Sequence, residues 1–160
     1  MVLGMTIETF TRLHVVISLV GIGSGLVAVF AMLGERRREG WTTLFLGSTV
    51  LTSVTGFGFP FDRLLPSHKV GILSLAVLTL ALVGRYVTHF RGSWRWIYIV
   101  SCVIALYLNV FVLVAQLFQK VPALATMAPT QSEPPFQVAQ LVVLALFVWL
   151  GVLAVKRARP

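Results

Sequence analysis

Apolar residues fill five long stretches of the chain, and short polar or charged segments separate them. The five stretches cover residues 13–33, 41–58, 67–87, 96–119 and 136–155. A helix of about 20 apolar residues crosses the hydrocarbon core of a bilayer. The pattern therefore predicts an all-α fold, a single transmembrane domain over residues 1–160 built as a bundle of five membrane-spanning helices.

The second stretch is the shortest and the most polar. Its hydroxyl side chains belong to Thr42, Thr43, Ser48, Thr49, Thr52, Ser53 and Thr55. Charge nevertheless favours a crossing, because the cytoplasmic ends of membrane helices carry the excess of Lys and Arg. With five spans, nine basic residues share one side, namely Arg36, Arg37, Arg38, Arg85, Arg91, Arg95, Lys156, Arg157 and Arg159. Four lie on the other side, namely Arg12, Arg63, Lys69 and Lys120. This bias predicts the N-terminus outside and the C-terminus in the cytoplasm.

Composition supports the membrane class, since 58% of the residues are hydrophobic and 11% are charged, against about a quarter charged in soluble domains. The net charge of +8 could suit a nucleic-acid-binding protein. The basic residues flank apolar runs, however, and form no basic surface interleaved with aromatic residues. The lipid bilayer is therefore the predicted partner, and nucleic acid is not. Cys102 is the only cysteine, which excludes an internal disulfide and a cysteine-cluster metal site.

One face of the first predicted helix consists of a histidine followed by small residues. Spacings of four, three and four place its members together, namely His14, Ser18, Gly21 and Gly25. Small residues let helices approach closely. We expect this face to pack against two adjacent stripes of the second helix, Ser48/Thr52/Thr55 and Thr49/Ser53/Gly56.

Polar side chains collect in the half of the predicted bundle nearer the outer surface. They are His14, Ser18, Thr52, His68, Asn109 and Gln116, with Asp62 and Glu133 at the outer mouth. Polar residues at membrane depth usually face the bundle interior or a watered cavity. The sequence thus predicts a polar pocket for a small apolar or amphipathic ligand, such as a quinone, a lipid or a porphyrin. The structural alternative is that these groups only hydrogen-bond between helices, to water or to loop carbonyls.

The two outer histidines also allow an electron-transfer hypothesis. His14 and His68 could bind a divalent metal together with Glu8, Asp62 or Glu133, because imidazole and carboxylate suit zinc, copper or iron. They could instead be the axial ligands of a haem b held in the bundle. The sequence leaves the cofactor open.

Catalytic signatures are missing from the sequence. It has no nucleophile next to a general base, no pair of intramembrane carboxylates and no phosphate-binding glycine loop. This pattern favours a non-enzymatic role, either in ligand binding or as an accessory subunit of a larger membrane complex. The chain could also form a homo-oligomer.

Three segments carry a resemblance to a known class. They are TVLTSVTGFGFPF at residues 49–61, ALYLNVFVL at 105–113 and APTQSEPPF at 128–136. In these the chain resembles small multi-pass inner-membrane proteins of bacteria that carry no assigned activity. The resemblance implies a periplasmic outer face and supplies no catalytic residues to carry over. In span count and length the chain is also similar to the tryptophan-rich sensory, or translocator, proteins that bind porphyrins and sterols. It lacks their Trp- and Pro-rich motifs and is not assigned to them.

Overall fold

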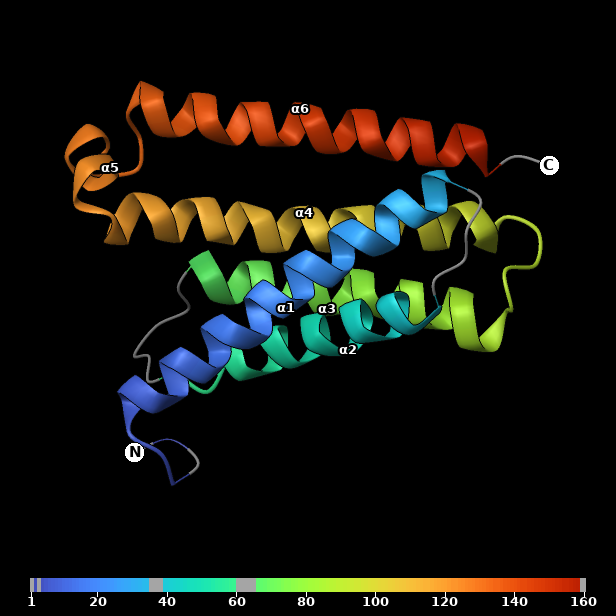
Figure 1. Ribbon diagram of the computed structural model, residues 1–160, viewed down its shortest axis with the longest axis horizontal. Helices are drawn as coiled ribbons and strands as arrows, with labels where there is room; N and C mark the ends of the chain where they lie inside the picture. The colour runs from blue at the N-terminus through green and yellow to red at the C-terminus, as the bar shows by residue number, and fades with distance from the viewer. Residues whose placement is uncertain (1, 3, 35–38, 60–65, 159–160) are drawn as a thin grey trace.

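The computed structural model describes residues 2, 4–34, 39–59 and 66–158, and these residues form a helical bundle (Figure 1). Its elements are α1 (Ile7–Leu33), α2 (Glu39–Gly56), α3 (Pro66–Leu82), the π-helix η1 (Val83–Val87), α4 (Trp94–Lys120), α5 (Pro122–Met127) and α6 (Pro134–Arg157). Apart from an isolated bridge between Val2 and Met5, the described residues contain no β-structure. The all-helical prediction is confirmed.

The helices differ from the predicted spans mainly at their ends. α1 begins earlier than expected because Thr6 caps it, its hydroxyl accepting a hydrogen bond from the backbone N–H of Thr9 at 3.2 Å. The third span ends in the π-helix η1. The connection between α4 and α6 contains the short helix α5, whose first residue is Pro122.

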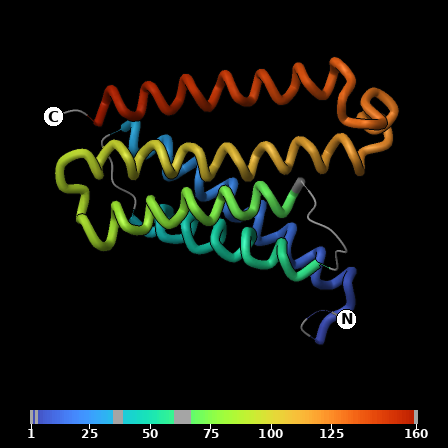
Figure 2. Tube along the Cα trace, turned by 180° about the vertical axis from the view of Figure 1, so that it is seen from behind, coloured from blue at the N-terminus to red at the C-terminus, as the bar shows by residue number. Residues whose placement is uncertain are grey.

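The two ends of the bundle can be named by their elements. Figure 1 places the N-terminus of α1 and the helix α5 at one end, which we call the α5 end. The C-terminus of α6 and the tight turn between η1 and α4 lie at the opposite end, which we call the turn end (Figure 2). The N-terminus of α1 and the C-terminus of α6 thus lie at opposite ends of the bundle (Figures 1 and 2).

α4 is the central helix. It packs against α1, α3 and α6, while α1 crosses obliquely over α2. α6 contacts mainly α4 and stands at the edge of the bundle, as both views show (Figures 1 and 2). At the turn end, Arg157 Nη1 donates to the backbone carbonyl of Leu33 at 2.8 Å, which joins α6 to the C-terminus of α1. The buried core gathers around α4 and includes Phe45, Leu46, Leu78, Cys102 and Leu106.

The outer surface of the bundle is apolar. Four helices of the described residues are long and apolar enough to cross a membrane, namely Ile7–Leu33, Ser67–Val87, Trp94–Lys120 and Pro134–Arg157. On α6, Leu141 is 62% exposed and Trp149 is 59% exposed. Apolar patches of this extent on a helical surface are typical of proteins that face lipid.

Close approach of α1 to α2 and α4 depends on the predicted glycine face. A Cβ atom on Gly21 would lie 3.2 Å from Ser48 Oγ and 3.3 Å from Thr49 Oγ1, and one on Gly25 would lie 2.7 Å from Phe45 Cδ2. The expected contact between this face and α2 is therefore confirmed.

Only part of the second hydroxyl stripe of α2 faces α1. Thr49 also reaches Asn109 of α4, and Ser53 donates to Ser74 Oγ of α3 at 3.1 Å. The expectation that both stripes pack on α1 was wrong in this respect. α2 lies between α1 and α3 with α4 near it, so its adjacent stripes meet different neighbours.

Hydroxyl groups inside the helices are mostly satisfied by their own backbone. Ser18, Ser24, Ser48 and Thr55 each donate to the carbonyl four residues earlier, at 2.6–2.8 Å. Such bonds pair a hydroxyl where lipid offers no partner. They leave the hydroxyl oxygen able to accept one further hydrogen bond.

Candidate functional site

His14 and Thr55 form a hydrogen-bonded pair between α1 and α2 at the α5 end. His14 Nδ1 lies 2.8 Å from Thr55 Oγ1, and the Thr55 hydroxyl donates to Leu51 O at 2.7 Å. Because the Thr55 hydroxyl proton is used in the bond to Leu51 O, the Thr55 oxygen accepts the bond from His14 and His14 Nδ1–H donates it. In the neutral imidazole this bond therefore places the proton on Nδ1 and leaves the lone pair on Nε2.

Phe59, from the segment after α2, covers this histidine. The Phe59 ring meets the rings of His14 and Phe10 edge-on, at centroid distances of 5.3 Å and 5.0 Å. Gly58 makes this cover possible, because a Cβ on it would lie 2.8 Å from Phe10 Cζ. His14 is therefore shielded from one side by the Phe59 ring, which Phe10 supports.

His68 lies in the first turn of α3 and is 3% exposed. The Phe57 ring is tilted against its imidazole, with centroids 5.6 Å apart. Phe57 also rests on the open side of Gly71, where an added Cβ would lie 3.2 Å from the ring. The same short segment, residues 57–59, thus contacts both predicted histidines through different phenylalanines.

Thr52 has a hydroxyl oxygen that is buried and has no hydrogen-bond partner. Gln140 Oε1 is the other buried side-chain oxygen or nitrogen of this kind among the described residues. Thr52 lies one helical turn after Ser48, which is beside Gly21. It lies one turn before Thr55, which is beside His14. It therefore belongs to the α2 stripe that faces α1. An unsatisfied buried hydroxyl costs about 1–3 kcal/mol.

The remaining predicted site residues are distributed along the bundle. Ser18 donates to His14 O at 2.8 Å, one turn along α1. Asn109 Nδ2 donates to Thr49 Oγ1 at 3.2 Å, so it bridges α4 and α2. Gln116 is partly buried two turns further along α4. Asp62 lies outside the described residues.

Glu133 shapes the loop that leads into α6. Its carboxylate accepts hydrogen bonds from the Thr130 hydroxyl at 2.9 Å and from the backbone N–H groups of Thr130 and Ser132 at 3.2 and 3.1 Å. Desolvation opposes ionisation, but these hydrogen bonds outweigh it and lower the pKa of Glu133. The geometry indicates a turn-forming role for this carboxylate.

No group of three or more His, Cys, Asp or Glu side chains that could hold a metal occurs among the described residues. Glu8, one of the predicted ligands, pairs instead with Arg12 at 2.6 Å on the exposed surface of α1. The metal hypothesis therefore stays a prediction that rests on His14 and His68 themselves.

Comparison with protein-family models, curated proteins and solved structures finds no match to this chain.

Several residues of this region were missed by the sequence analysis. Phe57 and Phe59 cover the histidines, and the alternating phenylalanines of residues 57–61 were an available signal. Gln140 Nε2 donates to Phe111 O at 3.1 Å, and Gln131 Nε2 donates to Ala115 O at 2.7 Å. These amides attach α6 and its preceding loop to α4, and no spacing rule predicts a bond from a side chain to a distant backbone.

Proposed function

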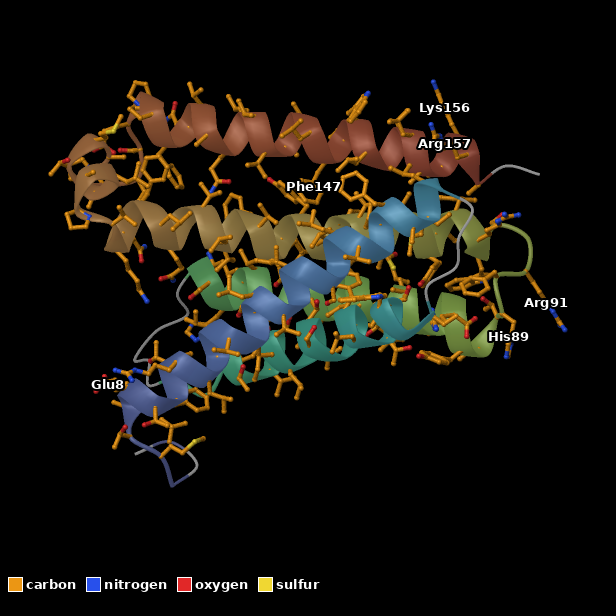
Figure 3. All side chains as sticks on the ribbon, viewed as in Figure 1. Glu8, His89, Arg91, Phe147, Lys156 and Arg157 are labelled. Carbon is orange, nitrogen blue, oxygen red and sulfur yellow. The ribbon has the colours of Figure 1, made fainter. Side chains whose placement is uncertain are left out.

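We propose that this chain is a five-span protein of the bacterial inner membrane, with its N-terminus in the periplasm and its C-terminus in the cytoplasm. Two features support this topology. The N-terminus of α1 and the C-terminus of α6 lie at opposite ends of the bundle, and basic residues gather at the turn end (Figures 1 and 2). Figure 3 marks His89, Arg91, Lys156 and Arg157 at the turn end and Glu8 at the other end. An excess of cations is typical of the cytoplasmic side.

α2 is the fifth span in this proposal. Its 18 residues extend about 27 Å at 1.5 Å per residue, close to the thickness of a hydrocarbon core of about 30 Å. Its hydroxyl groups are compatible with this depth because many of them donate within the helix or face other helices.

The proposed activity is binding of a small apolar or amphipathic molecule at the α5 end, which is the periplasmic end in this topology. The observation that carries it is the buried Thr52 hydroxyl without a partner, on the helix face that also holds Thr55 and its bond to His14. Thr52 can donate to a carbonyl or accept from a hydroxyl, and His14 Nε2 can accept. A quinone or another lipid-soluble molecule with an oxygenated head group matches this set.

The test is to extract and identify the small molecules that co-purify with the protein in mild detergent, for the native chain and two variants. Thr52→Val removes the candidate contact at nearly constant volume. Thr79→Val is its matched control, since Thr79 is an exposed hydroxyl of α3 that donates to Leu75 O at 2.8 Å. Loss of one hydrogen bond of about 1–2 kcal/mol lowers affinity roughly 5- to 30-fold.

We therefore expect Thr52→Val to lower the bound fraction markedly and Thr79→Val to leave it unchanged. Equal retention by both variants would contradict the proposal. If instead a second protein co-purifies with all three chains and no small molecule does, the role of an accessory subunit is favoured.

A second proposal, haem or metal binding for electron transfer, is supported by the His14 tautomer. Histidines that ligate metals usually donate their other ring N–H to an acceptor, as His14 Nδ1 does to Thr55. Absorption spectra and metal analysis of the purified protein test it. A Soret band or a stoichiometric metal that is lost in His14→Ala and in His68→Ala would support it, and a colourless, metal-free protein would exclude it.

A further inference from the structure

Arg85 is a cation on the inward face of its helix. The buried residues Ser74, Leu78 and Ala81 follow one another at spacings of four and three along α3, and Arg85 comes four residues later. The π-helical turn η1 shifts the α-helical register at Arg85, but its guanidinium still lies beside Tyr98 of α4 and Thr43 of α2. Arg85 thus points toward neighbouring helices rather than outward to lipid, and its side chain is partly buried.

The guanidinium of Arg85 lies among neutral groups from three elements. Nη1 lies 3.5 Å from Tyr98 Oη of α4, and Nη2 lies 3.5 Å from Thr43 Oγ1 of α2. The carbon Cζ stands 5.4 Å from the centre of the Tyr86 ring. Both hydrogen bonds are long, and an arginine has five N–H donors. Most of its donor capacity is therefore available to an acceptor.

Carboxylates are scarce around this arginine. Within the described residues the only ion pair is the one between Arg12 and Glu8, which lies on α1 at the opposite end. The cations of the turn end are Arg85, Arg91, Arg95, Lys156 and Arg157, and its one described acid is Glu39. Among the described residues, this end therefore carries more cations than acids.

The local backbone holds Arg85 at this position. η1 is a π-helical turn, closed by the bond from Thr88 N to Val83 O at 3.0 Å, and such turns are frequent at functional sites. Gly84 brings it close to α4, since a Cβ there would lie 3.1 Å from Tyr98 Cβ. The following turn contains His89 and Phe90 with φ of 49° and 60°, and Phe90 packs edge-on against Tyr98 at 4.9 Å.

We propose that Arg85, held in place by its hydrogen bonds to Thr43 and Tyr98, binds the phosphate of an anionic phospholipid in the leaflet at the turn end. Phosphate oxygens accept paired N–H groups of a guanidinium. Basic sites between membrane helices at the level of the head groups are suited to such lipids. The acyl chains would lie along the apolar surface of the bundle. This site is separate from the one at the α5 end and does not depend on the ligand proposed there.

The experiment measures phosphatidylglycerol bound to the delipidated full chain in neutral detergent, by native mass spectrometry over a lipid titration. Arg85→Gln removes the proposed contact. Arg91→Gln is the matched control, because it makes the same charge change at an exposed residue of the neighbouring turn. Phosphatidylcholine is the zwitterionic comparison, and inorganic phosphate is the competitor that represents a soluble ligand.

We expect Arg85→Gln to weaken phosphatidylglycerol binding about tenfold or more, as the loss of a charge-assisted hydrogen bond implies. Arg91→Gln should stay within about threefold, as exposed charges usually do. Arg85→Lys keeps the charge but loses the planar fork, so it should bind clearly more weakly than the native chain. It also keeps the test decisive if Arg85→Gln does not fold.

Three results would overturn the proposal. Equal losses in Arg85→Gln and Arg91→Gln would mean that only the net charge of this end matters. If Arg85→Lys bound phosphatidylglycerol as tightly as the native chain does, recognition by the guanidinium fork would be excluded. Full displacement of the lipid by inorganic phosphate would identify a soluble phosphate compound as the ligand in place of a membrane lipid.

Discussion

Asn109 Nδ2 donates a hydrogen bond to Thr49 Oγ1 at 3.2 Å, and the two residues are 60 positions apart in the chain. The bond joins α4 to α2 beside Gly21 of α1, where an added Cβ would lie 3.5 Å from Asn109 Nδ2. Three helices therefore meet at this amide. This contact gives Asn109 a structural role, which was one of the two interpretations that the sequence left open.

The energy of this bond can be measured with a double-mutant cycle of Asn109→Leu and Thr49→Val. Interhelical hydrogen bonds in membrane proteins average about 0.6 kcal/mol and reach about 1.7 kcal/mol. We expect a coupling energy in this range from unfolding in mixed micelles of anionic and neutral detergent. Strictly additive single-variant effects would contradict a direct bond between the two side chains.

Gly25 and Gly23 provide a matched test of helix packing. A Cβ on Gly25 would lie 2.7 Å from both Leu106 Cδ1 and Phe45 Cδ2, whereas nothing lies within 4 Å of one on Gly23. Phe45 and Leu106 are fully buried and have little room to move. Overpacking of this kind costs about 1–3 kcal/mol.

The same detergent unfolding assay should show Gly25→Ala destabilised by that amount and Gly23→Ala close to native. Equal stabilities for the two variants would mean that α1 does not cross α2 and α4 at Gly25.

Glu133 predicts a pH dependence of the loop before α6. Hydrogen bonds from Thr130 and Ser132 lower its pKa in the folded protein. A depressed pKa stabilises the loop at pH values above the ordinary value for Glu, about 4.3, and this stabilisation is lost as the pH falls through the lower folded value.

Hydrogen exchange of the Thr130 and Ser132 amides should therefore show full protection at neutral pH and less below about pH 4, after correction for intrinsic exchange rates. Glu133→Gln should lack this acid-dependent change. If the protection of these two amides in the native chain did not vary with pH, the Glu133 carboxylate would be ruled out as their hydrogen-bond acceptor.

Much of the architecture could be predicted from the order of residues in the chain. Hydropathy depends only on which residues are neighbours in the chain, so the apolar helices and the loops between them were visible in the sequence. The glycine face of α1 was also predictable, since a period of 3.6 residues fixes which side chains share a face. Its contact with Ser48 and Thr49 followed from size alone.

Tertiary structure alone decided which partner each polar group has. Periodicity predicts a face but not the helix opposite it, so the adjacent hydroxyls of α2 could not be divided among His14, Asn109 and Ser74 in advance. It also showed that Thr52 is buried without a partner, and that Arg85 turns inward at a π-helix. Both depend on the packing of several helices around one side chain, and such packing has no signal in the order of residues.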